Sequence, residues 1–378
     1  MRLIFTIVFL SVTFFLQAQQ NILYTMMHDD IERTYFVYVP ESYAEDTPAP
    51  LVFNFHGFGS NAVEQDFYTD MRGVADTAGF LLVHPQGTLY NGVTQHWNVG
   101  GFTQGSTVDD IGFTSAMIDS IAAEYSVDLD RVYSTGMSNG GFMSYLLACQ
   151  LGDRIAAIAS VTGSMTPETY AECAPTHPTP VMQIHGTLDP TVPYDGNNIA
   201  EPIEDVVQYW VDYNNCNPDA TVIEVENTNL LDLTTAEHYI YDGGDNGVHT
   251  EFFRIEDGTH TWPGAALAFP GTNYDINASI EIWNFFNRYD INGLIDPTTN
   301  TTNIELAESI QIYPNPMQDV LQINLIEQHT TDYFLHNSIG QLVNYGTITT
   351  ANASLDVSAL PSGIYYLSVG GTTKKVVK

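Results

Sequence analysis

The segment TGMSNGG at residues 135–141 places Ser138 between Gly136 and Gly140. A serine hydroxyl is a weak nucleophile, so it needs a neighbouring base and a backbone turn that exposes it. A sharp turn between a strand and a helix gives that exposure, and flanking glycines remove Cβ atoms that would collide there. RVYST before the turn predicts a strand, and FMSYLLAC after it predicts a helix. This context predicts a nucleophilic Ser138; a plain glycine-rich turn is the alternative.

A serine nucleophile requires a base and an acid that orients the base. IHGTLDP offers Asp189 just past an apolar run, and EDGTHTWPG offers His260 just past another. Both would lie in loops at strand ends, where a parallel sheet collects its catalytic groups. The chain order Ser, Asp, His is that of a nucleophile-elbow enzyme. We therefore expect Asp189 as the acid and His260 as the base.

Other acids and histidines compete for these two roles. The competing acids are Asp195, Asp109 and Asp110, and the last two open a predicted helix, where acids favour the N-terminus. His56 and His185 each precede a glycine at a strand end, so we expect them to brace loops by hydrogen bonds. His84, His329 and His336 are weaker candidates.

Acyl transfer places negative charge on the carbonyl oxygen, and two backbone N–H groups must stabilise that charge. One is expected from Asn139, directly after the nucleophile and at the positive end of a helix. The second is expected from Gly57 or Phe58 in the HGFG segment at 56–59. A strand-ending turn without this role is the alternative reading of HGFG.

Strand-like runs alternate with helical patterns up to about residue 295. Strands are expected at 33–39, 79–87, 131–135, 156–163, 180–186 and 250–257, and helices at 64–78, 111–125, 201–213 and 278–289. This alternation predicts an α/β fold with a mainly parallel central sheet flanked by helices. DPTTNTTN at 296–303 reads as a linker, and short strands in 304–378 predict a small β-sandwich.

The aromatic content of the predicted site loops suggests a substrate contact. Trp97 and Trp262 fall in loops near the expected catalytic residues. Their rings could stack on an aromatic acid, a sugar or a polyester chain. The alternative is that both tryptophans pack structurally.

Composition restricts the classes of partner. The 378 residues include 45 acidic and 10 basic side chains, for a formal net charge of −35. Such a chain should repel nucleic acids and anionic lipid surfaces, so neither is an expected partner.

The N-terminal segment predicts a secretory signal peptide over residues 1–18. Arg2 is followed by the apolar run 3–16 and by Ala18, and this run is too short to span a bilayer.

The cysteines fit an oxidising compartment. The chain has three, and we expect Cys149 and Cys173 to form a disulfide, because this pair closes a short loop beside the candidate nucleophile. The spacing of cysteines and histidines indicates no zinc site, and the expected chemistry needs no metal or organic cofactor.

Five motifs in this order, HGFGSNA, DDIGF, RVYSTGMSNGG, IHGTLDPTVPYDG and GTHTWPG, resemble the polyhydroxybutyrate depolymerase-like esterases, a family similar to feruloyl and acetylxylan esterases. The resemblance covers residues 22–290 and implies an α/β-hydrolase fold over 19–295. It also implies Ser138 as nucleophile, Asp189 as acid and His260 as base. Relatives often have a second cysteine pair where this chain has only Cys216, so Cys216 is expected to be free.

The C-terminal segment resembles the sorting domain of type IX secretion in Bacteroidetes. QIYPNP, LPSGIYYLSV and the terminal lysines carry this resemblance over residues 304–378. It implies export to the cell surface or the medium by the type IX secretion machinery. A small accessory sandwich that binds carbohydrate is the alternative.

Together these patterns predict a secreted serine esterase that acts on a polyester or a plant cell-wall polysaccharide ester. A polysaccharide-binding protein without activity and a peptidase of the same fold are the alternatives.

Overall fold

The computed structural model describes residues 20–267, 269–295, 310–314, 316–325, 331–337, 342–348, 352–358, 360–369 and 372–378. The chain divides into two compact units, Met1–Leu294 and Ile295–Lys378. The predicted signal peptide at 1–18 and linker at 296–303 lie outside the described residues. Within the described residues no helix is both long enough and apolar enough to cross a membrane.

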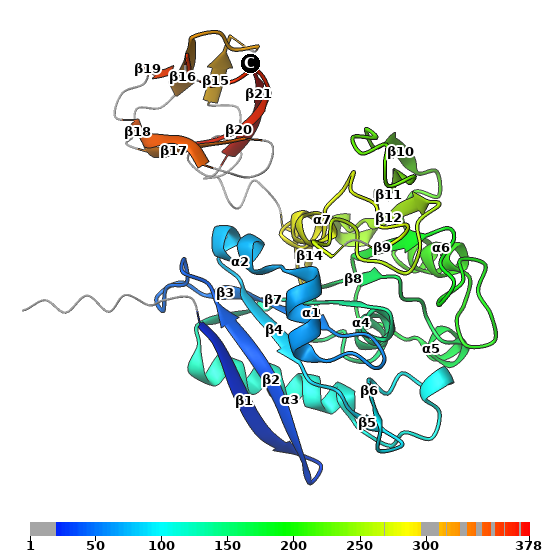
Figure 1. The fold of residues 1–378 in the computed structure, drawn as a ribbon. Helices are drawn as coiled ribbons and strands as arrows, with labels where there is room; N and C mark the ends of the chain where they lie inside the picture. The colour runs from blue at the N-terminus through cyan, green and yellow to red at the C-terminus, as the bar shows by residue number, and fades with distance from the viewer. Residues whose placement is uncertain are drawn as a thin grey trace, which may run out of the picture. The chain divides into compact units, whose positions relative to one another are not determined.

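The main unit is built on a twisted ten-stranded sheet of order β1-β2-β4-β3-β7-β8-β9-β12-β11-β10 (Figure 1). The six strands from β4 to β12 run parallel, and antiparallel pairs extend both edges. The strands are β1 Gln20–His28, β2 Ile31–Val39, β3 Ala49–Phe55, β4 Leu81–Pro85, β7 Val127–Met137, β8 Ala157–Val161, β9 Val181–Gly186, β10 Thr221–Glu224, β11 Thr235–Tyr241 and β12 Thr250–Glu256. The predicted mainly parallel sheet is therefore confirmed.

Helices cover both faces of this sheet (Figure 1). They are α1 Ala62–Thr69, α2 Arg72–Ala78, α3 Asp110–Glu124, α4 Asn139–Gln150, α5 Pro167–Glu172, α6 Ile203–Tyr213 and α7 Ala278–Phe286. Side chains of β3 alternate between the faces, so Phe53 joins the core under α3, α4 and α6, whereas Val52 joins the core under α2 and α7. Smaller elements are strands β5 Thr88–Tyr90, β6 Thr94–His96, β13 Tyr289–Asp290 and β14 Gly293–Leu294, and 3₁₀ turns Gly101–Thr103 and Asp245–Gly247.

The helical pattern over 64–78 forms two helices rather than one. Asp70 adopts a positive φ of 29° and ends α1, and α2 begins at Arg72. The expected strand at 79–87 is β4, which spans Leu81–Pro85. These differences move element boundaries without changing the arrangement of the layers.

The second unit consists of two antiparallel sheets, β15-β16-β19 and β18-β17-β20-β21. Its strands are β15 Ile310–Tyr313, β16 Val320–Leu325, β17 Thr331–Asn337, β18 Leu342–Ile348, β19 Asn352–Asp356, β20 Ile364–Val369 and β21 Thr372–Val377. Leu321 and Leu355 from one sheet share a buried cluster with Leu335 and Leu367 from the other. Two sheets with a common core agree with the predicted β-sandwich.

A disulfide joins Cys149 at the end of α4 to Cys173 directly after α5, as expected, and Cys216 is free and buried. The bond tethers the loop that carries α5 to the helix that follows Ser138. It therefore restrains the chain on the face of the sheet covered by α4 and α6.

Replacing both bridged cysteines, as Cys149→Ser/Cys173→Ser, should lower the free energy of unfolding by about 3 kcal/mol, because a closed loop of this length restricts the unfolded chain. The sequence separation of the two cysteines is 24 residues. Urea unfolding followed by tryptophan fluorescence measures the loss. The matched control is the wild type unfolded in a strong reductant, which opens the same disulfide. If the urea midpoint of the reduced wild type lay well above that of the double variant, the prediction would be contradicted.

Candidate active site

Ser138 occupies a strained turn between β7 and α4. Its backbone has φ 56° and ψ −120°, a conformation that L-residues rarely adopt. The Ser138 N–H donates to the Val161 carbonyl at 2.9 Å, and the Ser138 carbonyl accepts from the Phe142 N–H at 3.0 Å. These bonds hold the strained residue in place, as the nucleophile-elbow prediction requires.

The glycines around Ser138 allow α4 to approach β3 closely. A Cβ on Gly136 would lie 2.6 Å from the Phe55 carbonyl oxygen, and a Cβ on Gly140 would overlap the same oxygen. A Cβ on Gly141 would meet Ser160 Oγ at 2.5 Å. The close contacts alone therefore require glycine at all three positions.

Asp189 and His260 are brought together by two neighbouring parallel strands. Asp189 follows β9 and His260 follows β12, and these strands pair directly. His260 Nδ1 lies 2.7 Å from Asp189 Oδ2, while Asp189 Oδ1 accepts from the Thr191 and Val192 N–H groups at 2.8 and 2.9 Å. With the Nδ1 proton directed at the carboxylate, Nε2 of His260 is left as the basic atom.

Ser138 and His260 both line one cavity of about 480 Å³. Gly57 and Phe58 line the same cavity, and an ideal Cβ on Gly57 would lie 3.5 Å from Ser138 Cβ. The backbone of the HGFG segment is thus placed beside the serine. Asn139 is the first residue of α4, so its N–H belongs to the positive end of that helix.

His56 braces the HGFG segment, as expected. Its Nε2 accepts from the Gly87 N–H at 2.9 Å, so its Nδ1 carries the proton and donates to the Gly57 carbonyl at 2.8 Å. Burial lowers the pKa of His56 to about 4. The ring is therefore neutral at pH 7.

His185 braces the loop of Asp189 in the same way. Its Nδ1 accepts from Gln183 Nε2 at 3.0 Å, and its Nε2 donates to the Val192 carbonyl at 2.9 Å. Burial lowers the pKa of His185 to about 4. His185 Nε2 also lies 3.4 Å from Asp189 Oδ2, so a neutral ring supports the carboxylate without neutralising it.

The tryptophan prediction does not fit the structure. Trp97 exposes 0% and Trp262 exposes 1% of their surface, so neither ring is presented to a substrate. The Trp97 backbone pairs with the Asn139 side chain at 2.7 and 3.1 Å, and its Nε1 donates to the His56 carbonyl. Trp262 Nε1 donates to Ser279 Oγ. Both tryptophans are buried supports of the site.

Exposed aromatic side chains line the cavity instead. Its apolar wall contains Phe58, Phe67, Tyr68, Leu267 and Phe269. Phe58 and Phe67 expose 43% and 59% of their surface. The phenylalanines of HGFG and of the AFPG segment after His260 could have been named as candidates from the sequence. The direction in which their rings turn, however, depends on the surrounding loops.

The competing acids and His84 lie outside the cavity that contains Ser138. Asp110 pairs with Arg33 at 2.7 Å in the interior, and Asp109 caps α3 through the Gly112 N–H. Asp195 is exposed, and His84 is fully buried. None of these residues lines the cavity that contains Ser138.

Among the described residues, His28, Asp29 and Asp109 each bring one possible ligand atom to within 4.8 Å of the others. These three residues lie outside the lining of the Ser138 cavity. The His28 ring already contacts Asp109 at 3.2 Å.

Residues 33–195 match the family model described as esterase PHB depolymerase, and residues 311–378 match that described as secretion system C-terminal sorting domain. The main unit resembles the polyhydroxybutyrate depolymerase-like esterases. The second match supports secretion to the cell surface or the medium. Both matches agree with the resemblances found in the sequence.

Two similar proteins are named for ester hydrolysis. The bifunctional acetylxylan esterase/xylanase XynS20E of Neocallimastix patriciarum is 26% identical over 71% of this chain and 35% of its own length. Feruloyl esterase B of Piromyces equi is 32% identical over 43% of this chain and 30% of its own length. The chain thus spans about a third of these relatives.

A solved structure, acetyl xylan esterase from Aspergillus awamori, superposes with a TM-score of 0.52 at 15% identity. The superposition covers 70% of this chain and 98% of that chain. At this identity the likeness shows the fold, which is that of an α/β-hydrolase. The comparisons together support a carboxylic ester hydrolase.

Gly140→Ala should destabilise the protein by about 1–3 kcal/mol and reduce esterase activity, because its new methyl group pushes α4 away from β3. Gly73→Ala is the matched control, since Gly73 is also helical and a Cβ added there would meet nothing within 4 Å. That control should be neutral or stabilising by up to about 1 kcal/mol. Urea unfolding compares the two, and equal effects would contradict the contact argument.

Acid should destabilise the fold as the pH falls from about 6.5 to about 4. The pKa values of His56 and His185 are lowered from 6.5 to about 4, so in this window the unfolded chain binds protons that the folded chain does not. Stability is complete above this window and declines through it, by on the order of 2 kcal/mol for each histidine. Urea unfolding at pH 7 and pH 4.5 measures the loss.

His84→Leu tests the same linkage away from the site loops. Both ring nitrogens of His84 are without hydrogen-bond partners among the described residues, and burial lowers its pKa to about 3 although the Asp66 carboxylate lies 3.8 Å away. Leucine cannot take up a proton in the unfolded chain, so the variant should lose less stability between pH 7 and pH 4.5. An unchanged loss would rule out His84 as a contributor.

Proposed function

We propose that this protein is a secreted serine esterase in which Ser138 is the nucleophile, His260 the base and Asp189 the acid. The observation that carries the proposal is that Ser138, in its strained turn, and His260, hydrogen-bonded to Asp189, line the same cavity. Relatives named as acetylxylan and feruloyl esterases support the same class of reaction.

In the first half-reaction, Ser138 Oγ attacks the ester carbonyl carbon while His260 Nε2 accepts the hydroxyl proton. The Asp189 carboxylate orients the ring and stabilises its protonated form. The backbone N–H groups of Asn139 and of Gly57 or Phe58 would bind the oxyanion. His260 then donates its proton to the departing alcohol, which leaves an acyl-enzyme.

In the second half-reaction, His260 accepts a proton from water, and the resulting hydroxide attacks the acyl carbon. Ser138 leaves as its alkoxide and recovers the proton from His260, which releases the carboxylic acid. The cycle needs no redox step and no group beyond the chain and water. Every proton that leaves the serine or the water passes through the same imidazole.

The substrate class follows from the cavity wall. Phe58, Phe67, Tyr68 and Phe269 line the same cavity as Ser138, which suits an ester with an aromatic or otherwise apolar portion. A feruloylated polysaccharide and a polyester chain both present such a portion. We place the esterase domain at 19–295, followed by a linker at 296–303 and a sorting domain at 304–378 that directs export through the type IX machinery.

Ser138→Ala should lower kcat for a p-nitrophenyl ester by about three orders of magnitude or more, because the hydroxyl that forms the acyl-enzyme is removed. Asp189→Asn should lower it strongly as well, because the imidazole loses its orienting charge. Steady-state kinetics and labelling by a fluorophosphonate probe measure both effects. Near-wild-type turnover by Ser138→Ala would refute the assignment.

Thr191→Ser is a matched control, since it keeps the backbone N–H that donates to Asp189 and should leave kcat nearly unchanged. Parallel assays on methyl ferulate, acetylated xylan and polyhydroxybutyrate film then rank the ester classes. Turnover of a peptide substrate in preference to all three would favour a peptidase instead.

A further inference from the structure

A second groove lies on the exposed face of α6. It has a volume of about 430 Å³ and is lined by Tyr170, Asp205, Gln208, Tyr209, Asp212 and Tyr213. None of these residues lines the cavity that contains Ser138. The groove is therefore separate from the proposed catalytic site.

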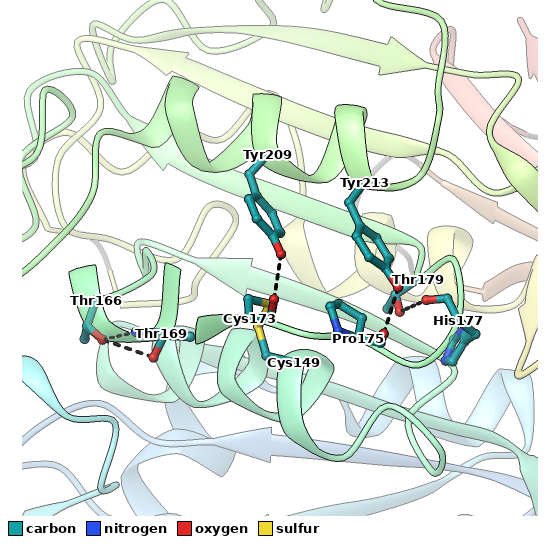
Figure 2. The surroundings of a disulfide bond; sticks show 9 residues. All are labelled: Cys149, Thr166, Thr169, Cys173, Pro175, His177, Thr179, Tyr209 and Tyr213. Atoms are coloured by element: carbon teal, nitrogen blue, oxygen red, sulfur yellow. Dashed lines mark hydrogen bonds between the residues drawn. A yellow bond between two sulfur atoms is a disulfide. The ribbon is translucent and has the colours of Figure 1, made fainter. Parts of the chain in front are cut away.

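Two of its tyrosine rings are held parallel. The Tyr209 and Tyr213 rings lie within 4° of one another with centroids 6.4 Å apart, as i and i+4 neighbours on α6. Both rings extend from α6 toward the segment after α5 (Figure 2). The Tyr209 hydroxyl donates to the Cys173 carbonyl at 3.2 Å, and the Tyr213 hydroxyl donates to the Pro175 carbonyl at 2.8 Å.

The disulfide fixes the segment that accepts these two bonds. Cys173 is joined to Cys149 of α4, so the carbonyl acceptors are tied to the helix packed on the central sheet (Figure 2). Rings anchored at both ends lose little conformational freedom when a ligand stacks on them. Tyr170 adds a third ring, tilted 54° to Tyr209 at 5.1 Å.

Polar side chains share this face of α6. Asp205, Gln208 and Asp212 are exposed and follow one another at the i+3 and i+4 spacing of a single helical stripe. Gln208 Nε2 donates to Asp212 Oδ1 at 2.8 Å, which orients both groups. The lining thus combines carboxylate acceptors with an amide, and its negative charges oppose an anionic ligand.

We propose that this groove binds a neutral polysaccharide chain at a site distinct from the catalytic cavity. Sugar rings present apolar C–H faces that stack on aromatic rings, and their hydroxyls donate to carboxylates. The near-parallel Tyr209 and Tyr213 rings follow one another along α6 with Tyr170 beside them, which suits an extended chain of sugars, whereas capture of an organic cation needs rings arranged around one point. Binding here would hold the enzyme on a polymer and raise the local concentration of its esters.

Affinity gel electrophoresis of the full chain carrying Ser138→Ala tests the proposal without hydrolysis. Soluble xylan, xyloglucan, mixed-linkage β-glucan and galactomannan serve as probes. At least one should retard the protein, and adding Tyr209→Ala/Tyr213→Ala should weaken its retardation by about tenfold or more in apparent Kd. No retardation by any probe, or retardation that survives the double substitution, would overturn the proposal.

Three further variants separate binding from folding. Tyr213→Phe retains the ring and should retain most of the affinity, while Gln208→Ala/Asp212→Ala changes only exposed polar groups and should weaken binding. Tyr345→Ala removes a tyrosine of the second unit that is 70% exposed and should change nothing. Loss of binding in Tyr345→Ala equal to that of the double tyrosine variant would count against a site on α6.

The esterase proposal is checked separately in the same set of proteins. With Ser138 intact, Tyr209→Ala/Tyr213→Ala should leave turnover of a p-nitrophenyl ester unchanged and lower turnover of a polysaccharide ester. Tetramethylammonium is the cationic probe. If it displaces the polysaccharide, or binds in its place with the same dependence on Tyr209 and Tyr213, the groove is an organic-cation site and the saccharide proposal falls.

Discussion

The close approach of α4 to β3 is the contact on which the rest of the site depends. Gly140 packs against the Phe55 carbonyl with no room for a side chain, so the turn at Ser138 can be sharp. The same approach places HGFG, which continues from β3, beside the serine. One backbone contact therefore positions both the candidate nucleophile and one half of the candidate oxyanion site.

The remaining parts converge because parallel strands end at the same edge of a sheet. Strands β9 and β12 are paired, so they place Asp189 and His260 within hydrogen-bonding distance although the two residues are far apart in sequence. Buried neutral histidines then stiffen the loops: His56 supports HGFG and His185 supports Asp189. Burial lowers the pKa of each ring to about 4, so both rings are neutral at pH 7. A neutral ring has one donor and one acceptor nitrogen, so each histidine keeps the same two hydrogen-bond partners.

Helices and strands with a strong hydrophobic pattern and clear end signals could be predicted from the sequence. Those whose position or ends depend on tertiary contacts could not. The parallel core strands read as apolar runs, and α3, α6 and α7 read as helices. Strands β1 and β10 lie at the two edges of the sheet with many exposed side chains, so their patterns carry little burial signal. The break between α1 and α2 at Asp70 depends on a positive φ that periodicity cannot reveal.

The sequence by itself determined which residues could perform acyl transfer, because glycine spacing, strand ends and the order Ser, Asp, His are local or linear properties. Only the tertiary structure decided the roles of the aromatic residues. Trp97 and Trp262 are buried, whereas Phe67 lines the cavity that contains Ser138, and Tyr209 and Tyr213 line a separate groove. Aromatic rings are equally suited to a core and to a binding surface, so their function is fixed by what packs against each face.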